Sequence, residues 1–200
     1  MTTETCPNPD HEDDATLVLR ALVGDLGAFD GLVRRYRGAA LAVAQGVTGS
    51  FDRAQDAAQD AFVLAFSKLP QLDDPARFSS WLCAIVRHRA TRLSMREGRA
   101  QATEAEELEA YVLRHSGEVS PHPMEEMIRR IEGISVRNAL GRLPEELQVV
   151  MRLYYYEEWP VKRIAEFLSL PATTVKWRLH EGRRRLKRTL CGVFEEDDDE

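Results

Sequence analysis

The densest group of side chains suited to a charged ligand lies at residues 183–188, where five of the six residues are arginine or lysine. Just upstream, apolar residues recur at helical spacing on both sides of a turn-like Leu170-Pro171 pair. This pattern is typical of a helix-turn-helix, which binds nucleic acid through its second helix. A small residue at Ala165 lets the two helices cross closely. The residues of the pattern are Ile164, Ala165 and Leu168 before the turn and Val175 and Leu179 after it.

The helix that follows this turn has two chemically different faces. At about 100° per residue, the apolar face holds Val175, Leu179, Gly182 and Leu186, and the opposite face holds Thr173, Trp177, His180 and Arg184. Polar side chains near the start of such a helix reach base edges, and the arginines that follow meet phosphates. A basic, solvated helix that touches nothing is the plainer interpretation. An exposed Trp177 could contact a thymine methyl group or pack on a neighbouring protein.

A second group with chemical potential is Asp52, Asp56 and Asp60, which stand four residues apart on one predicted helix face. Such carboxylates could form an enzyme site, but no histidine or glutamate set with ligand spacing accompanies them. Cys6, Cys83 and Cys191 stand singly without a C-x-x-C pair, which excludes a disulfide framework and a zinc site. We therefore expect no catalytic residues, no metal, no cofactor and no enzyme activity.

Composition indicates a water-soluble chain. Of its 200 residues, 44% are hydrophobic and 30% charged, and the longest apolar runs are far shorter than the roughly 20 residues that cross a bilayer. The first fifteen residues are acidic and polar, unlike a secretory signal. We expect a cytoplasmic protein without membrane insertion.

The net charge of −6 hides an alternation along the chain. Residues 1–30 carry −6, 31–100 carry +5, 101–135 carry −5, 136–194 carry +6 and 195–200 carry −6. Two basic blocks between acidic segments predict two domains that each meet a polyanion.

Helical periodicity predicts an all-α fold of two small helical domains joined by an acidic flexible linker, the second domain a helix-turn-helix domain. Glycines divide the first block into short segments at 17–23, 28–36 and 39–47, followed by helices at 52–69 and 79–96. Helices are then predicted at 124–143, 144–156, 161–168 and 172–190. The predicted units are an acidic disordered tail at 1–14, a helical domain at 15–100, an acidic linker at 101–133, the helix-turn-helix domain at 134–194 and an acidic tail at 195–200.

The order and spacing of three stretches in each block resemble a known family. The first block carries LRALVGDLGAFDGLVRRYR, DRAQDAAQDAFVLAFSKL and FSSWLCAIVRHRA, and the second runs from ALGRLPEELQVV through the helix-turn-helix to EGRRRLK. Together they resemble a bacterial RNA polymerase sigma factor of the extracytoplasmic function (ECF) group of the sigma-70 family. The resemblance covers about residues 16–100 and 134–190.

The resemblance implies an alternative sigma factor that binds RNA polymerase core and directs promoter-specific initiation. The first domain, similar to sigma region 2, would dock on the β′ clamp helices and melt the minus-10 element. The second, similar to region 4, would contact the β flap and read the minus-35 element. An anti-sigma factor is a further implied partner.

The implied sites are three. The core-binding residues are Asp56, Gln59, Asp60 and Phe62, and the minus-10 residues are Leu72, Asp73, Asp74, Arg77, Arg87, His88 and Arg92. The minus-35 residues are Thr173, Thr174, Lys176, Trp177, Arg178, His180, Arg183 and Arg184. Arg89 supplies a further cation beside Phe78 and Trp81, two aromatics that we place mainly in the core.

The chain departs from the family pattern at several of these positions. Asp73 and Asp74 replace the expected base and glycine of the minus-10 loop, and two acids there would repel phosphate. Glu181 stands where a base is usual, and Gly182 replaces an alanine at a cost of about 1 kcal/mol in helix propensity. The alternative function is a stand-alone helix-turn-helix regulator that binds DNA without polymerase; it leaves residues 52–93 unexplained.

Overall fold

The computed structural model describes residues 12–98 and 136–195, and their regular structure is helical, as the periodicity predicts. We call these two ranges the N-terminal half and the C-terminal half. The N-terminal half holds α1 (Asp14–Leu22), α2 (Leu26–Thr48), α3 (Phe51–Lys68), the short 3-10 turns η1 (Leu69–Gln71) and η2 (Pro75–Arg77), and α4 (Phe78–Gly98). The C-terminal half holds a helical turn at 136–141, then α7 (Glu145–Tyr155), α8 (Val161–Leu168) and α9 (Ala172–Glu195).

Helix starts follow ordinary capping chemistry. The Asp13 carboxylate accepts a hydrogen bond from the Thr16 amide at 2.8 Å, and Asp25 accepts from the Ala28 amide at 3.3 Å. Acidic caps of this kind satisfy amides that have no partner in the first helical turn. Pro70 lies two residues after the last residue of α3, within η1, as expected for a residue that cannot continue a helix.

The prediction of separate segments at 28–36 and 39–47 was wrong, because α2 runs unbroken through Gly38 and Gly46. Tertiary packing explains both glycines. A Cβ on Gly46 would lie 2.7 Å from Cγ2 of Val149, and a Cβ on Gly38 would overlap the carboxylate of Glu157. The glycines therefore let α2 approach the C-terminal half closely.

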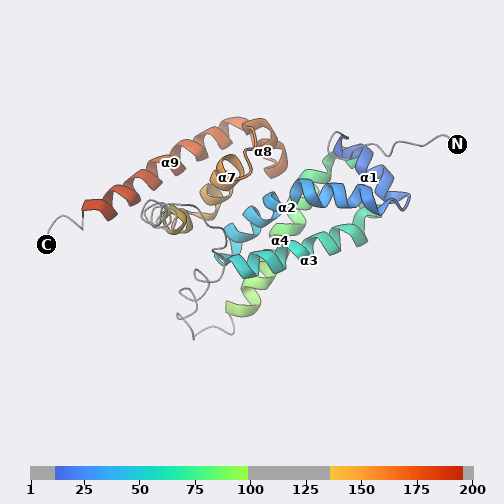
Figure 1. The fold of residues 1–200 in the computed structure, drawn as a ribbon, viewed down its shortest axis with the longest axis horizontal. Helices are drawn as coiled ribbons and strands as arrows, with labels where there is room; N and C mark the ends of the chain where they lie inside the picture. Colours follow the sequence, from blue (N-terminus) through green and yellow to red (C-terminus); the bar gives the residue numbers. More distant parts are fainter. Residues whose placement is uncertain (1–11, 99–135, 196–200) are drawn as a thin grey trace, which may run out of the picture.

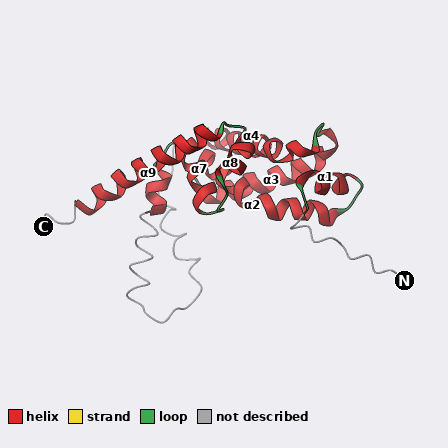
Figure 2. Cartoon of the chain, turned by 90° about the horizontal axis from the view of Figure 1, so that it is seen from above, coloured by secondary structure: helices red, strands yellow, loops and turns green. Residues whose placement is uncertain are grey.

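Helix α2 lies at the centre of the described structure. It packs against α1, α3 and α4 within its own half and against α7 of the other half (Figure 1). In both views α9 extends from this body toward the C-terminal end (Figures 1 and 2). One contiguous hydrophobic cluster includes buried residues from both halves.

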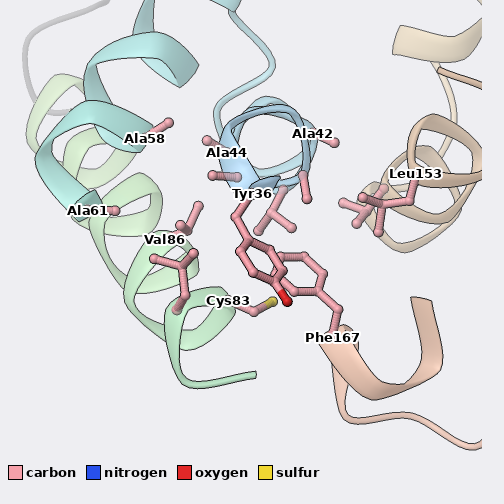
Figure 3. Packing of buried hydrophobic residues seen from close by; sticks show 14 of the residues in the cluster. Tyr36, Ala42, Ala44, Ala58, Ala61, Cys83, Val86, Leu153 and Phe167 are labelled. Atoms are coloured by element: carbon pink, nitrogen blue, oxygen red, sulfur yellow. The ribbon is translucent and has the colours of Figure 1, made fainter. Parts of the chain in front are cut away.

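Aromatic side chains join the two halves. Tyr36 of α2 reaches toward Phe167 of α8 (Figure 3), and their rings stack with centroids 6.0 Å apart. Trp159 meets both rings edge-on at 5.8 and 5.2 Å, and the Arg163 guanidinium lies 3.9 Å from its ring centroid. Nearby, Ala42 points toward Leu153 of α7. These contacts bury Tyr36, Trp159 and Phe167 almost completely.

The Tyr36 hydroxyl is held from its own half. It donates a hydrogen bond to Asp14, whose other oxygen accepts from Arg35 at 2.6 Å. Burial and the bond to Asp14 raise the pKa of Tyr36 above its ordinary value. Glu12 binds Arg20 at 2.6 Å, so residues 12–14, predicted as the end of the acidic tail, take part in the N-terminal half.

Other predicted units lie outside the described residues. These are the chain before residue 12, the acidic linker at 101–133, the start of the helix predicted at 124–143, and residues 196–200 of the C-terminal tail.

Candidate nucleic-acid interface

The predicted helix-turn-helix is formed by α8 and α9. Ile164, Ala165, Val175 and Leu179 are buried between the helices, as their spacing predicts. Ser169 ends α8 in the left-handed region at φ 54°, and the Leu170 amide then donates to the Ala165 carbonyl at 2.9 Å. This turn directs the chain into α9 with one face left open.

The open face of α9 carries most of the residues predicted to meet the minus-35 element. Thr173, Lys176, Trp177, His180 and Arg184 are exposed, and Trp177 leaves 60% of its surface accessible. Side chains one and two turns apart on this face can enter a groove together.

Three other predicted minus-35 residues lie away from this open face. Arg178 donates from Nη2 to Oε2 of Glu146 at 3.1 Å, and Arg183 donates from Nε to the Tyr155 hydroxyl at 2.7 Å. Arg183 also lies over the Tyr154 and Tyr155 rings. Thr174 is half-buried. The two arginines thus join α9 to α7.

Gly182 has a packing role that depends on a residue of α7 and that the sequence pattern alone does not indicate. A Cβ at this position would lie 2.9 Å from Cγ and Sδ of Met151. The missing side chain brings α9 close to α7, which offsets the lower helix propensity of glycine.

Glu181 lies against two arginines of the same helix. Its Oε1 accepts from Arg184 Nη2 at 2.9 Å and from Arg185 Nε at 2.7 Å, and its Oε2 accepts from Arg184 Nε at 2.9 Å. Hydrogen bonds from Arg184 and then from Arg185 lower the pKa of the Glu181 carboxyl to about 2. The acid that departs from the family pattern is therefore covered by two cations.

A second cationic surface lines a hollow of about 440 Å³ between the end of α3 and α4. The Nε of Arg89 is buried there without a hydrogen-bond partner among the described residues. Phe78 is buried and the half-buried Trp81 packs against the core cluster, as predicted, and Trp81 also forms part of the wall of the hollow. The lining residues are Leu64, Lys68, Gln71, Trp81, Ala84, Ile85, His88, Arg89 and Arg92.

The seven predicted minus-10 residues do not form one surface. Only His88 and Arg92 line the hollow. Arg77 lines a different hollow between the halves, and Arg87 lies 3.6 Å from Glu145 of α7. Two further residues line the hollow between α3 and α4: Gln71, which begins the segment that the resemblance matches to minus-10 opening, and Lys68, which it did not imply. Lys68 ends α3 and Gln71 ends η1, and tertiary packing brings both to α4.

In the loop from Leu72 to Arg77, one of the two acids, Asp74, has a local structural role. Leu72 packs against the core cluster. The exposed Asp74 accepts from the Ala76 amide at 3.0 Å and lies 3.4 Å from Arg77 Nε, so it caps η2. Asp73 is exposed.

The outer edge of α3 combines acids with exposed apolar groups. Asp56, Gln59 and Asp60 are exposed, whereas Phe62 packs against the core cluster. The exposed apolar groups on this helix are instead Val63, with 67% of its surface accessible, and Phe66, with 44%. Neither residue was predicted as part of the docking surface, although each lies three or four residues after a predicted docking residue.

The described residues also bear on metal binding and on membrane insertion. Within residues 12–98 and 136–195, no three potential ligands among histidine, cysteine, aspartate and glutamate gather as a metal site. No helix in this part of the chain is long and apolar enough to cross a membrane. Burial raises the pKa of the Cys83 thiol to about 11.

Comparison with known proteins matches both halves. Residues 32–100 match the family described as Sigma-70 region 2, and residues 134–186 match Sigma-70, region 4. The solved structure of CnrH in complex with the cytosolic domain of CnrY has a TM-score of 0.58 at 23% identity and covers 90% of this chain and 99% of that one.

Relatives match across nearly the whole chain. RNA polymerase sigma-H factor of Pseudomonas aeruginosa is 28% identical, covering 92% of this chain and 97% of that protein. ECF RNA polymerase sigma factor SigW of Bacillus subtilis is 29% identical over 84% of this chain and 91% of that protein. ECF RNA polymerase sigma factor SigM of Mycobacterium tuberculosis is 30% identical over 90% and 86%, respectively. With two sigma-70 regions in order and relatives of this kind over its length, the chain belongs to the ECF group of the sigma-70 family, the alternative sigma factors that bind RNA polymerase core and direct it to promoters.

Proposed function

We propose that this sigma factor divides its work among three surfaces: the outer edge of α3 docks on core, the hollow between α3 and α4 takes up the melted minus-10 strand, and the outer face of α9 reads the minus-35 element. The observation that carries this proposal is the presence of two separate cationic surfaces, one on each half, beside an acidic edge on α3. Polyanion contact at two places and protein contact at a third are what promoter recognition by a holoenzyme requires.

The α3 edge suits a protein partner. Asp56 and Asp60 supply negative charge for a basic partner surface, and Val63 and Phe66 supply apolar area that water leaves on binding. The proposed partner is the β′ clamp helices, with the β flap meeting the C-terminal half.

This docking predicts a charge-reversal result. The double variant Asp56→Lys and Asp60→Lys should weaken binding to purified core by about tenfold or more, because two attractive contacts become repulsive. Asp30→Lys, at an exposed position on α2, is the matched control and should bind like the wild type. Equal affinity of both proteins for core would remove the α3 edge from the proposal.

The hollow suits an unpaired base and its backbone. Trp81 and Ile85 offer apolar wall, while Lys68, His88 and Arg92 surround it with groups that attract phosphate. Arg89 lines the same hollow, and its buried Nε–H has no acceptor among the described residues, so a turn of this side chain toward a bound base or phosphate satisfies that donor.

We expect Arg89→Met to keep the apolar stem and core binding but to reduce promoter melting. The readout is permanganate reactivity of unpaired thymines in the minus-10 element. Normal melting by this variant would place the captured strand elsewhere on α4.

The decisive experiment for the whole function is run-off transcription with bacterial core polymerase on promoter fragments from the same genome. Transcripts that depend on this protein, with both elements aligned upstream of their starts, are the expected result. Tight duplex binding by the isolated protein with no transcripts and no binding to core would instead favour the stand-alone regulator.

In this function the chain performs no covalent chemistry itself. Its effect is differential binding, since holoenzyme prefers promoter to bulk DNA. Its partners place it in the cytoplasm, where core polymerase acts. CnrH was solved bound to the cytosolic domain of CnrY, which supports the proposal that an anti-sigma factor also binds this chain.

A further inference from the structure

The feature that the proposed function leaves unexplained is the acid in the basic part of α9. Glu181 lies two residues before the run at 183–188, where its negative charge opposes phosphate binding. Yet only 10% of its side chain is exposed, against 58% for Arg184 and 46% for Arg185. The surface presented to solvent is therefore cationic.

The hydrogen bonds leave particular edges of the arginines free. A guanidinium has five N–H donors. Glu181 engages the Nε–H of Arg184 and one N–H on Nη2, as well as the Nε–H of Arg185. Arg184 keeps three donors on its far edge and Arg185 keeps four, which is the arrangement that binds a phosphate bidentately.

The location suits this use. Arg184 lies on the outer face of α9, seven residues and thus about two helical turns after Trp177. Two other arginines of the helix, Arg178 and Arg183, are engaged with α7. A side chain that is already fixed loses little conformational freedom when it binds a partner.

We propose that Glu181 is a positioning residue for promoter recognition, holding Arg184 and Arg185 so that their free N–H edges bind neighbouring phosphates of the minus-35 duplex. The inference rests on the proposed role of α9 and goes beyond it, because it assigns a favourable role to an acid within a DNA-binding face. If only net charge mattered, the effect of removing Glu181 on DNA affinity would have the opposite sign. Removing an acid from a cationic helix should strengthen DNA binding, whereas removing a positioning residue should weaken it.

The test uses full-length protein assembled with core polymerase and a promoter fragment identified by the run-off experiment. E181Q keeps the volume of the side chain but removes its charge. We expect promoter affinity to fall on the order of tenfold, as for loss of a residue that orients a binding group. The slope of log affinity against log salt concentration should become shallower by about one to two, because up to two phosphate contacts are lost. Equal or tighter binding with an unchanged or steeper slope would overturn the proposal.

The matched control is E166Q, which removes an exposed carboxylate from α8 that lies 4.0 Å from Lys162. It makes the same charge change in the same half of the protein. Its promoter affinity should be unchanged or slightly higher.

A double-mutant cycle separates positioning from a loss of helix stability. In an R184A/R185A background, E181Q should cause no further loss, because the groups it positions are gone. The same loss in both backgrounds would show that Glu181 acts through the helix itself, and the proposal would fail. A wild-type holoenzyme that is indifferent to a scrambled minus-35 element would overturn the proposed role of α9 and this inference with it.

Discussion

Arg87 of α4 and Glu145 of α7 form an ion pair across the two halves, with Nη1 3.6 Å from Oε1. Both side chains are about half exposed, so the pair contributes at most about 1 kcal/mol. Its importance is its position, because a cation predicted to meet minus-10 DNA is engaged with the half that carries the minus-35 helix.

Variants of this pair should therefore act differently on promoter opening. R87Q removes a cation and should reduce open-complex formation by holoenzyme, whereas E145Q releases Arg87 and should leave it equal to or above that of the wild type. Filter retention of heparin-resistant complexes measures both. An equal loss in the two variants would mean that the ion pair, not Arg87 itself, supports opening.

Because α7 packs closely against Gly46, replacing this glycine should change stability in the direction opposite to the one that helix propensity predicts. A methyl group there meets buried Val149, and overpacking typically costs about 1–3 kcal/mol. Gly46→Ala should lower the melting temperature even though alanine favours the helix by roughly 0.5–1 kcal/mol. Gly141→Ala, which meets nothing within 4 Å, should leave it unchanged or raise it.

A variant at Phe167 tests whether the folding of each half depends on its packing against the other. Its side chain is 1% exposed and contacts both Tyr36 and Trp159. Phe167→Ala should destabilise the protein by about 3–5 kcal/mol in urea unfolding, and α4 and α8 probes should still unfold together. A loss confined to the C-terminal half, with the N-terminal transition unmoved, would contradict shared packing.

The Cys83 thiol should resist alkylation at neutral pH. Its pKa of about 11 means that the reactive thiolate is scarce below that pH, and its burial restricts access. In a C6S/C191S background, reaction with iodoacetamide at pH 8 should be slow until denaturant is added. Rapid reaction of the folded protein would show that α4 opens locally.

The lowered pKa of the Glu181 carboxyl fixes the pH range in which its ion pairs with Arg184 and Arg185 stabilise the folded protein. Its folded-state pKa is about 2 against an ordinary 4.5, so its ion pairs stabilise the folded state fully above pH 4.5. That contribution is lost progressively as the pH falls from about 4.5 through about 2. The difference in unfolding free energy between wild type and E181Q should therefore be flat from pH 5 to 8 and shrink below this range. A difference that changes between pH 6 and 8 would implicate another group.

Local patterns predicted the second half of the molecule well. The interval from Val161 to Leu168 was predicted as a helix with the bounds that α8 has, because apolar period, turn and small residue at Ala165 agree. The face that holds Thr173, Trp177 and Arg184 also followed from period alone.

The features that could not be predicted from the sequence are contacts with residues far away along the chain. Arg183 turns toward Tyr155, 28 residues away, and Gly38 and Gly46 serve contacts more than one hundred residues further along. A helical wheel shows on which face a residue lies, but a long arginine side chain can reach around the helix. A glycine inside a helix also looks the same in the sequence as a glycine that ends one. Val63 and Phe66 were not predicted as docking residues. The helical period placed Phe62 both on the apolar face of α3 and among the docking residues, and period alone does not show which neighbouring apolar residues stay exposed.

Gly38 and Gly46, two of the four glycines of α2, limit how this protein can be recombined with its relatives. Because α2 is flanked on one side by its own bundle and on the other by α7, its surface is matched to a particular opposite helix. A hybrid that exchanged only residues 136–195 would place foreign side chains against Gly38 and Gly46. Exchange of promoter specificity between relatives should therefore succeed only when α2 is transferred together with the helices that it faces. The segment that has to be exchanged as a unit is then larger than either sigma region.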